Sequence, residues 1–241
     1  MKRSRILTGI FFLLLTISFA ANAQTADSRF ITYIADLKKQ HLQLYWKDDQ
    51  HQPFGSIQRL KSWLEAHKQQ LVFAMNGGMY KPDHSPLGLY IENGNTLSPL
   101  DTANGNGNFY LQPNGVFYIA TDNVPGICKT ADFKNNSKVK YATQSGPMLL
   151  IDGQLHAAFK EGSANLNIRN GVGILADGRV IFVMSKEGVN FYDFAGYFKS
   201  LGCRNALYLD GFVSRMYVPE KEWLQLDGDF GVMVGVQQEL R

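Results

Sequence analysis

A carboxylate, a hydroxyl and a cation fall close together late in the chain. Asp210 ends the short apolar run 206–209, and Gly211, Ser214 and Arg215 follow it. A run of that length predicts a buried strand, and the glycine permits a turn or the close approach of a ligand. Proteins that mix helices and strands commonly place binding chemistry at the carboxyl end of such a strand. The pattern fits an aspartate that caps its own turn equally well, so both interpretations stay open.

A second polar group follows the apolar run 71–75. Asn76, Gly77 and Gly78 come directly after this run. Two glycines at the end of a buried strand permit positive φ and leave backbone N–H groups free to face a ligand. The competing interpretation is a tight loop in which the asparagine caps its own backbone.

Two cations flank a predicted hairpin. Arg169 precedes the strand 172–175, Lys186 follows the strand 180–184, and Asp177-Gly178 lies between the strands as a turn signal. A hairpin brings residues on its two strands together, so both cations are predicted at one sheet end. Each cation alone is more often a solvated surface charge.

Other chemistries find little support. The segment 171–176 has the letters of a dinucleotide fingerprint, but a hairpin turn follows where that site needs a helix N-terminus. None of the five histidines forms a close pair with metal-ligand spacing, which argues against a zinc hydrolase. Ser145 lies in Gln-Ser-Gly-Pro rather than in a nucleophile elbow, and Pro147 argues against a helix starting just after it.

The start of the chain has the pattern of a secretory signal. Residues 1–23 combine a basic start, a short apolar stretch and Ala21-Asn22-Ala23 as a cleavage site. We therefore expect an exported protein, periplasmic or secreted, with a mature chain of residues 24–241. No later stretch is apolar enough to cross a membrane.

The net charge is +3, and the signal carries three basic and no acidic residues, so the mature charge is 3 − 3 = 0. The absence of a basic tract argues against nucleic acid as a partner.

The only two cysteines are Cys128 and Cys203. In an exported protein they could form a disulfide, although a core of this size does not need one. Cys203 also fits a small buried apolar side chain, so pairing stays open.

The spacing of apolar residues predicts an α+β fold in a single domain. Helices are expected over 56–67 and 191–201, and strands outnumber them. Turn signals at Asn93-Gly94, Asn114-Gly115 and Asp177-Gly178 each predict a hairpin between the flanking strands. Such frequent hairpins predict a mixed, largely antiparallel sheet with two main helices. The expected strands are 30–34, 42–46, 71–75, 87–92, 96 onward, 109–112, 116–120, 141–144, 148–151, 172–175, 180–184 and 231–236.

Taken together, these segments resemble the phosphodiester glycosidase family. The ordered set spans most of residues 70–217. The matching segments are Asn76-Gly77-Gly78-Met79-Tyr80, Ser145-Gly146-Pro147-Met148-Leu149, Arg169 with Gly173, 185–188 and 201–211.

The resemblance implies hydrolysis of a sugar–phosphate bond at the anomeric carbon, on a small-molecule or glycan phosphodiester related to exopolysaccharide or the cell envelope. It implies Asp210 as the catalytic carboxylate, with Arg169 and Lys186 as catalytic groups that stabilise phosphate charge. No cofactor is implied. The residues expected to position the substrate are Asn76, Gly77, Gly78, Ser145, Gly146, Gly211 and Ser214.

One segment departs from the family's pattern. Phe212 and Val213 stand where the family has glycines, and Arg215 stands where it has a second serine. This departure motivates a competing hypothesis, a non-catalytic saccharide- or phosphate-binding protein on the same scaffold. A third hypothesis is a metal-assisted phosphodiesterase, with Asp210 and Asn76 as ligands of a divalent cation.

Overall fold

The computed structural model describes residues 27–240, so the predicted signal over 1–23 lies outside the described residues. The strands form three sheets, and every strand pair is antiparallel. In spatial order, the first sheet is β1 (Phe30–Ala35), β12 (Val180–Ser185), β11 (Asn170–Ile174), β13 (Ala206–Tyr208), β9 (Met148–Ile151) and β10 (Gln154–Leu155). The second is β15 (Trp223–Leu224), β14 (Met216–Val218), β3 (Gln69–Gly78), β16 (Val232–Glu239) and β2 (His41–Tyr45). The third is β5 (Asn95–Ser98), β4 (Tyr90–Glu92), β8 (Val139–Ser145), β6 (Gly115–Ala120) and β7 (Pro125–Lys129).

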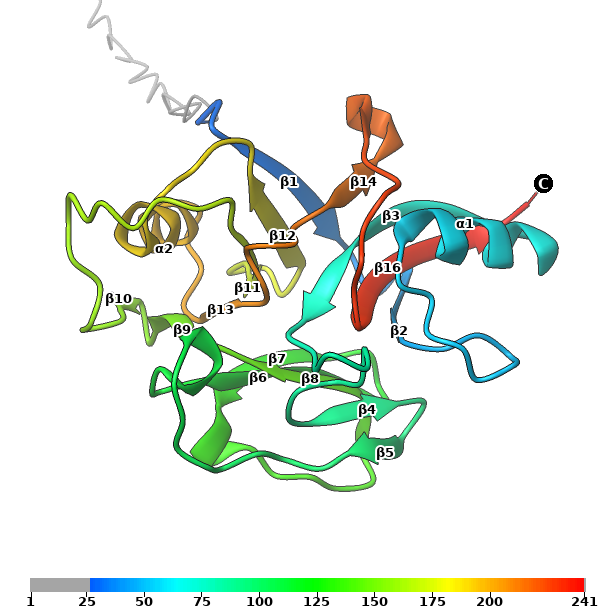
Figure 1. Ribbon diagram of the computed structural model, residues 1–241, viewed down its shortest axis with the longest axis horizontal. Helices are drawn as coiled ribbons and strands as arrows, with labels where there is room; N and C mark the ends of the chain where they lie inside the picture. Colours follow the sequence, from blue (N-terminus) through cyan, green and yellow to red (C-terminus); the bar gives the residue numbers. More distant parts are fainter. Residues whose placement is uncertain (1–26, 241) are drawn as a thin grey trace, which may run out of the picture.

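Two α-helices cover the first two sheets. Helix α1 (Ile57–Ala66) packs on β3, and α2 (Phe191–Ser200) packs on β9 and β10 at the opposite side of the molecule (Figure 1). Three short 3₁₀ segments occur in the connections: η1 (Asn108–Tyr110), η2 (Thr130–Asp132) and η3 (Pro219–Lys221). The predicted α+β class with two main helices is therefore confirmed.

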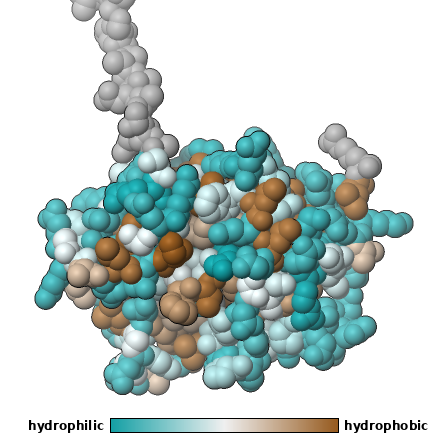
Figure 2. All heavy atoms as spheres, turned by 45° about the horizontal axis from the view of Figure 1, so that its top comes forward, coloured by the Kyte–Doolittle hydropathy of each residue, from teal (hydrophilic) through white to brown (hydrophobic). Residues whose placement is uncertain are grey.

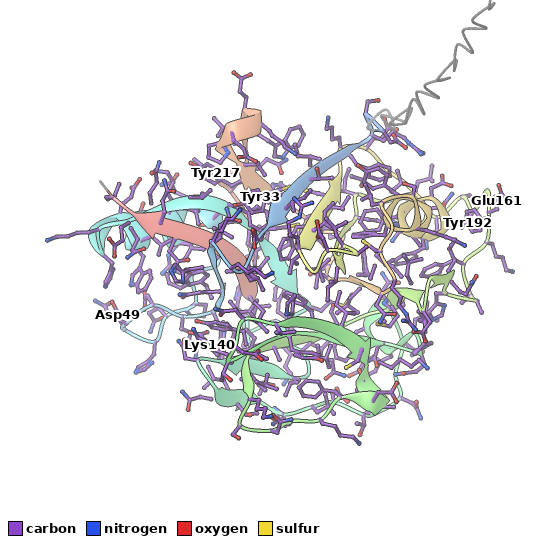
Figure 3. All side chains as sticks on the ribbon, turned by 180° about the vertical axis from the view of Figure 1, so that it is seen from behind. Tyr33, Asp49, Lys140, Glu161, Tyr192 and Tyr217 are labelled. Atoms are coloured by element: carbon purple, nitrogen blue, oxygen red, sulfur yellow. The ribbon has the colours of Figure 1, made fainter. Side chains whose placement is uncertain are left out.

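The main hydrophobic core lies where the three sheets meet. Tyr33 on β1 stacks on Phe73 on β3 with ring centroids 4.3 Å apart, and Figure 3 labels this tyrosine near the middle of the molecule. Phe182 on β12 lies 5.0 Å from the Phe73 ring and 6.1 Å from the ring of Phe117 on β6. Because these aromatic contacts join strands from all three sheets, the sheets pack as one body around a shared core.

The turn signals located hairpins correctly at two places. Asn93 and Gly94 have φ of 50° and 79°, as the tight turn between β4 and β5 requires. Strands β11 and β12 also pair as predicted around Asp177-Gly178.

The hairpin predicted over 109–112 and 116–120 is wrong, because β6 pairs with β7 and β8 instead. Pro113 has no N–H to give to a strand ladder. Asn114 is buried, and its Nδ2 donates to the carbonyl of Phe109 at 2.9 Å, which closes a loop after η1.

Cys128 and Cys203 are free thiols, the first half-buried on β7 and the second buried after α2. Among residues 27–240, no helix is long and apolar enough to span a bilayer. Figure 2 shows a largely hydrophilic face with several separate apolar groups.

Candidate active site

The Asp210 carboxyl group lies just past β13, near the junction of the sheets. Within residues 27–240 this carboxylate makes no hydrogen bond and no ion pair, and neither of its oxygens is sealed from solvent. Surrounding protein atoms still desolvate the group, and this burial raises its pKa from 3.8 to about 7. A carboxyl with such a pKa, open on one side, is suited to proton transfer near neutral pH.

Three side chains hold the backbone of Asp210 in place. Asn170 Oδ1 accepts from the Asp210 N–H at 2.7 Å. The Asp210 carbonyl accepts from Asn76 Nδ2 at 2.9 Å and from Ser214 Oγ at 2.8 Å. The backbone N–H and the carbonyl of Asp210 are therefore both fixed by side chains, which come from β3, from β11 and from the loop after Asp210.

Asn76 and Asn170 join two sheets at this point. Asn170 Nδ2 donates to the carbonyl and to Oδ1 of Asn76 at 3.0 and 2.9 Å. The Arg215 N–H also donates to Asn76 Oδ1 at 3.1 Å. Asn76 is only 1% exposed, so its observed role is to position the aspartate segment. A direct contact with substrate stays a prediction. Asn170 was missed, although a polar residue opening a buried strand was a usable signal.

Ser145 and Gly146 pack behind the same segment. The Ser145 hydroxyl is buried and donates to the carbonyl of Leu209. A Cβ at Gly146 would lie 2.5 Å from the Cβ of Asn114, so this glycine is needed for close packing. Ser145 therefore lies next to Asp210 in space, but its hydroxyl faces the protein interior.

The two glycines after Asn76 lie inside β3, where they allow close packing. Neither glycine adopts the positive φ that its lack of a side chain permits. A Cβ at Gly77 would lie 3.0 Å from the backbone of Met233 on β16. One at Gly78 would lie 2.6 Å from Thr143 Oγ1 on β8. Strand β3 continues through both residues. Glycine is needed at these two positions because β16 and β8 approach too closely to leave room for a side chain.

Arg169 is a buried cation without a counter-ion. The residue is 1% exposed, and its Nε and Nη2 donate to the carbonyls of Val189 and Asn165 at 2.7 and 2.9 Å. The guanidinium carbon lies 3.6 Å from the centre of the Phe191 ring at the start of α2. No carboxylate within residues 27–240 forms an ion pair with it. Burial lowers the pKa of this arginine, which shows how poorly the charge is solvated.

Tyr208 connects the arginine with the aspartate. Its ring centre lies 5.8 Å from the Arg169 guanidinium carbon. Burial raises the pKa of its hydroxyl to about 12, the nearby arginine lowers that pKa, and the Asp210 carboxylate raises it. Both charged groups therefore shift the pKa of this hydroxyl, in opposite directions. A Cβ at Gly211 would lie 2.0 Å from it, so only glycine fits there. Tyr208 was missed, although it ends β13 only two residues before Asp210.

Lys186 does not join this group. Arg169 lies opposite Ser185, which accepts from the Arg169 N–H at 2.9 Å. Lys186 is the next residue, and neighbouring residues of a strand point to opposite faces of a sheet. Its exposed ammonium instead lies 5.9 Å from the ring of Trp223 on β15. The structure thus brings Arg169 and Asp210 to the same tyrosine, but not the two predicted cations to each other.

The cation of Arg215 is neutralised within the protein. Its Nε donates to both carboxylate oxygens of Asp227 at 2.9 and 2.8 Å. Among residues 27–240 there is no cluster of three or more histidine, cysteine or acidic side chains that could hold a metal ion. Asn76 Oδ1, one ligand of the hypothetical divalent cation, already accepts two hydrogen bonds.

The site thus places an ionisable carboxyl and a buried cation beside one tyrosine, within an antiparallel α+β fold. The family model of phosphodiester glycosidase matches residues 69–233, so the chain belongs to the phosphodiester glycosidase family. A curated relative, the uncharacterized protein YigE of Escherichia coli, is 40% identical over 187 residues, which is 77% of this chain and 73% of the relative.

Solved structures share the fold. The catalytic domain of zebrafish N-acetylglucosamine-1-phosphodiester alpha-N-acetylglucosaminidase, auto-inhibited by its pro-peptide, matches with a TM-score of 0.59 and 15% identity over 88% of this chain and 84% of that one. An exported protein of Burkholderia pseudomallei, described as putative, matches with a TM-score of 0.56 and 11% identity over 86% of this chain and 73% of that one. At these identities the likeness shows the fold alone.

Proposed function

We propose that this protein hydrolyses a glycosyl-1-phosphodiester at the sugar's anomeric carbon and releases a free sugar and a phosphomonoester. One observation carries the proposal: the Asp210 carboxyl and the buried Arg169 guanidinium, neither of which forms an ion pair within residues 27–240, border the same tyrosine. Family membership and the activity in the zebrafish enzyme's name support the same reaction.

The buried guanidinium argues for an anionic ligand. Removing a charge from water costs several kcal/mol unless a partner compensates for it. Two backbone carbonyls and the Phe191 ring solvate Arg169 only partly. A phosphate beside Tyr208 would supply the missing negative charge, and its attraction to the guanidinium is strengthened by the low dielectric of the interior.

The tyrosine hydroxyl suits a phosphate oxygen. Because burial raises its pKa to about 12, the Tyr208 hydroxyl keeps its proton near neutral pH. It can therefore donate a hydrogen bond to the phosphate while Asp210 faces the sugar. Negative charge that grows on the leaving phosphate is then stabilised by a neutral donor and a cation.

Asp210 would act in its ionised form, as the base for water or as the nucleophile. In the direct reaction, the water oxygen bonds to the anomeric carbon and its proton passes to the Asp210 carboxylate. The bond between that carbon and the phosphate oxygen breaks, and its electron pair leaves on the phosphomonoester. A phosphate is a better leaving group than an alcohol, so the site needs less help from a general acid.

The test is release of a phosphomonoester from an N-acetylglucosamine-1-phosphodiester by the purified protein. We expect turnover by the wild type and a loss of about 1,000-fold or more in kcat for Asp210→Asn, whose amide cannot accept the proton. Lys186→Ala serves as a comparison and tests the role predicted for that lysine. Absence of turnover, together with equal ligand binding by wild type and Asp210→Asn, would support the non-catalytic binding protein instead.

We further infer that the protein works outside the cytoplasm, on a glycan phosphodiester of the cell envelope or an exopolysaccharide. The basic, apolar and small-residue pattern over residues 1–23 supports export. Mass spectrometry of the protein recovered from cell fractions tests this inference. The expected N-terminus is Gln24, in a periplasmic or secreted fraction, and an intact chain in the cytoplasm would contradict it.

A further inference from the structure

Phe212 is the feature of the site that the proposed chemistry does not use. It lies two residues after Asp210, and 89% of its surface is exposed. The other large apolar side chains on the described surface reach at most 59%. Burying a phenylalanine stabilises a protein by roughly 1.5–3 kcal/mol, so leaving one in water beside a carboxyl group suggests a ligand that covers it.

The exposure does not come from a loose loop, because the residues around Phe212 are anchored. Gly211 is buried against the Tyr208 hydroxyl. Val213 packs on the cluster beneath α1. Ser214 is 2% exposed and donates to the Asp210 carbonyl, and its N–H donates to the Gly211 carbonyl at 3.0 Å. The phenylalanine is therefore held outward from a fixed backbone.

A second exposed apolar residue lies on the segment that holds the arginine. Asn165 accepts from Arg169, and a Cβ at Gly211 would lie 2.5 Å from the Ile168 carbonyl. The segment 165–168 thus contacts both the guanidinium and the start of the Phe212 loop. Leu166 in this segment is 57% exposed. Leu166 therefore belongs to the segment that contacts the guanidinium, and Phe212 belongs to the loop that contacts this segment and the Tyr208 hydroxyl.

We propose that Phe212 and Leu166 form an apolar surface that binds the group esterified to the phosphate, and that this group has an aromatic or hydrocarbon face. The inference rests on the proposed function. If the phosphate lies toward Arg169 and the sugar toward Asp210, the group beyond the phosphate extends over the Arg169 side. A flat nucleoside base would stack on the phenylalanine ring, whereas a lipid chain would gain by burial of hydrocarbon.

The test compares three substrates that carry the same sugar 1-phosphate, esterified to methyl, to a nucleoside or to a long alkyl chain. We expect the wild type to prefer one or both larger esters over the methyl ester by about tenfold or more in kcat/KM. Phe212→Ala should remove most of that preference, mainly through KM, because the contact is remote from the reacting bond. Phe212→Trp should restore it.

The matched control is Val124→Ala, which removes another exposed apolar side chain, in the turn between β6 and β7. It should leave the substrate preference unchanged. Preference for the nucleoside ester alone would identify a stacked base, and preference for the alkyl ester alone a lipid.

Equal use of all three esters by the wild type, or a Phe212→Ala ratio within twofold of wild type, would overturn the inference and leave the proposed function standing. If no ester is turned over, calorimetry can measure the affinity of each intact ester for the wild type and for Phe212→Ala. The preference is then the affinity for each larger ester relative to the methyl ester. The failure of hydrolysis and the failure of the apolar surface are thus separable.

Discussion

The two helices of this protein have similar local signals but different surroundings. Each has ten residues and a side-chain N-cap: Ser56 Oγ accepts from Arg59 N–H, and Asn190 Oδ1 accepts from Asp193 N–H. The buried face of α1 is apolar, and its charged residues lie at the surface. The first residue of α2, in contrast, carries the buried guanidinium of Arg169 on its ring.

This difference separates packing from function. Around α1, every buried side chain has the apolar neighbours that it needs, so that region is complete by itself. Around the start of α2, a buried cation lacks a counter-ion and a nearby carboxyl lacks a partner within the described residues 27–240. Stability alone does not account for this second arrangement, because an uncompensated buried charge costs free energy, a cost that the proposed anionic ligand would offset.

The largest expected effect comes from removing the buried cation. Arg169→Met keeps the volume and the contact with Phe191 but deletes the charge, so kcat/KM should fall by about 100- to 1,000-fold. Arg59→Met on α1 is the matched control, since its side chain is 56% exposed, and it should retain wild-type kinetics. Arg169→Lys keeps the charge but loses the planar guanidinium that can bind a phosphate with two hydrogen bonds, so an intermediate kcat/KM is expected. Wild-type kinetics for Arg169→Met, with the fold intact by circular dichroism, would contradict the role.

The apolar helix should show the opposite behaviour. Leu64 on α1 is 2% exposed, and Leu64→Ala should lower the free energy of unfolding by about 3 kcal/mol because it leaves a cavity. The kcat of the folded variant should stay at the wild-type value. Urea denaturation and steady-state kinetics on the same preparation measure both quantities. A lower kcat in the folded variant would contradict this separation and would mean that α1 helps to hold the site.

Asp210→Asn should stabilise the protein while it inactivates the enzyme. The folded pKa of about 7 exceeds the ordinary 3.8, so the native state binds the proton more tightly than the unfolded chain. The wild type therefore loses stability as pH rises from about 4 to 7, and the neutral amide avoids that loss. We expect a gain of about 2 kcal/mol at pH 8, allowing for the partial exposure of the carboxyl, and almost none at pH 4. Thermal unfolding at both pH values measures the gain, and a pH-independent gain would rule out a raised pKa.

The smallest effects concern the two helix caps. Ser56→Ala and Asn190→Ala should each cost about 1 kcal/mol of stability, because each leaves a backbone N–H without its acceptor. Only Asn190→Ala should also lower kcat/KM, by about threefold, since it loosens the residue that supports Arg169. Equal kinetics for the two variants would remove the distinction between the helices.

The parts of the fold predicted from sequence are those that depend on nearby residues. Helix α2 was expected from the spacing of Phe191, Phe194 and Phe198, and the turn at Asn93-Gly94 from residues that tolerate positive φ. The strand through Gly77-Gly78 could not be expected in the same way, because the reason for those glycines lies on β16 and β8.

The candidate site was predicted only in part for the same reason. The hydrogen bonds from Asn76 to Asp210 and from Asn170 to Asn76 join residues 134 and 94 positions apart. Neither helical nor strand periodicity encodes such contacts. The sequence indicated that Asn76, Ser145 and Asp210 belong together. It could not indicate that the first two face inward, nor that Lys186 points to the other face of its sheet from Arg169.

Hydrolysis by an ionised Asp210 with a raised pKa should be visible in the dependence of kcat/KM on pH. We expect the rate to rise about tenfold per pH unit below an apparent pKa near 7 and to level above it, because only the carboxylate accepts the proton. A rate that is flat between pH 5 and 8, or that falls as pH rises through 7, would contradict the account.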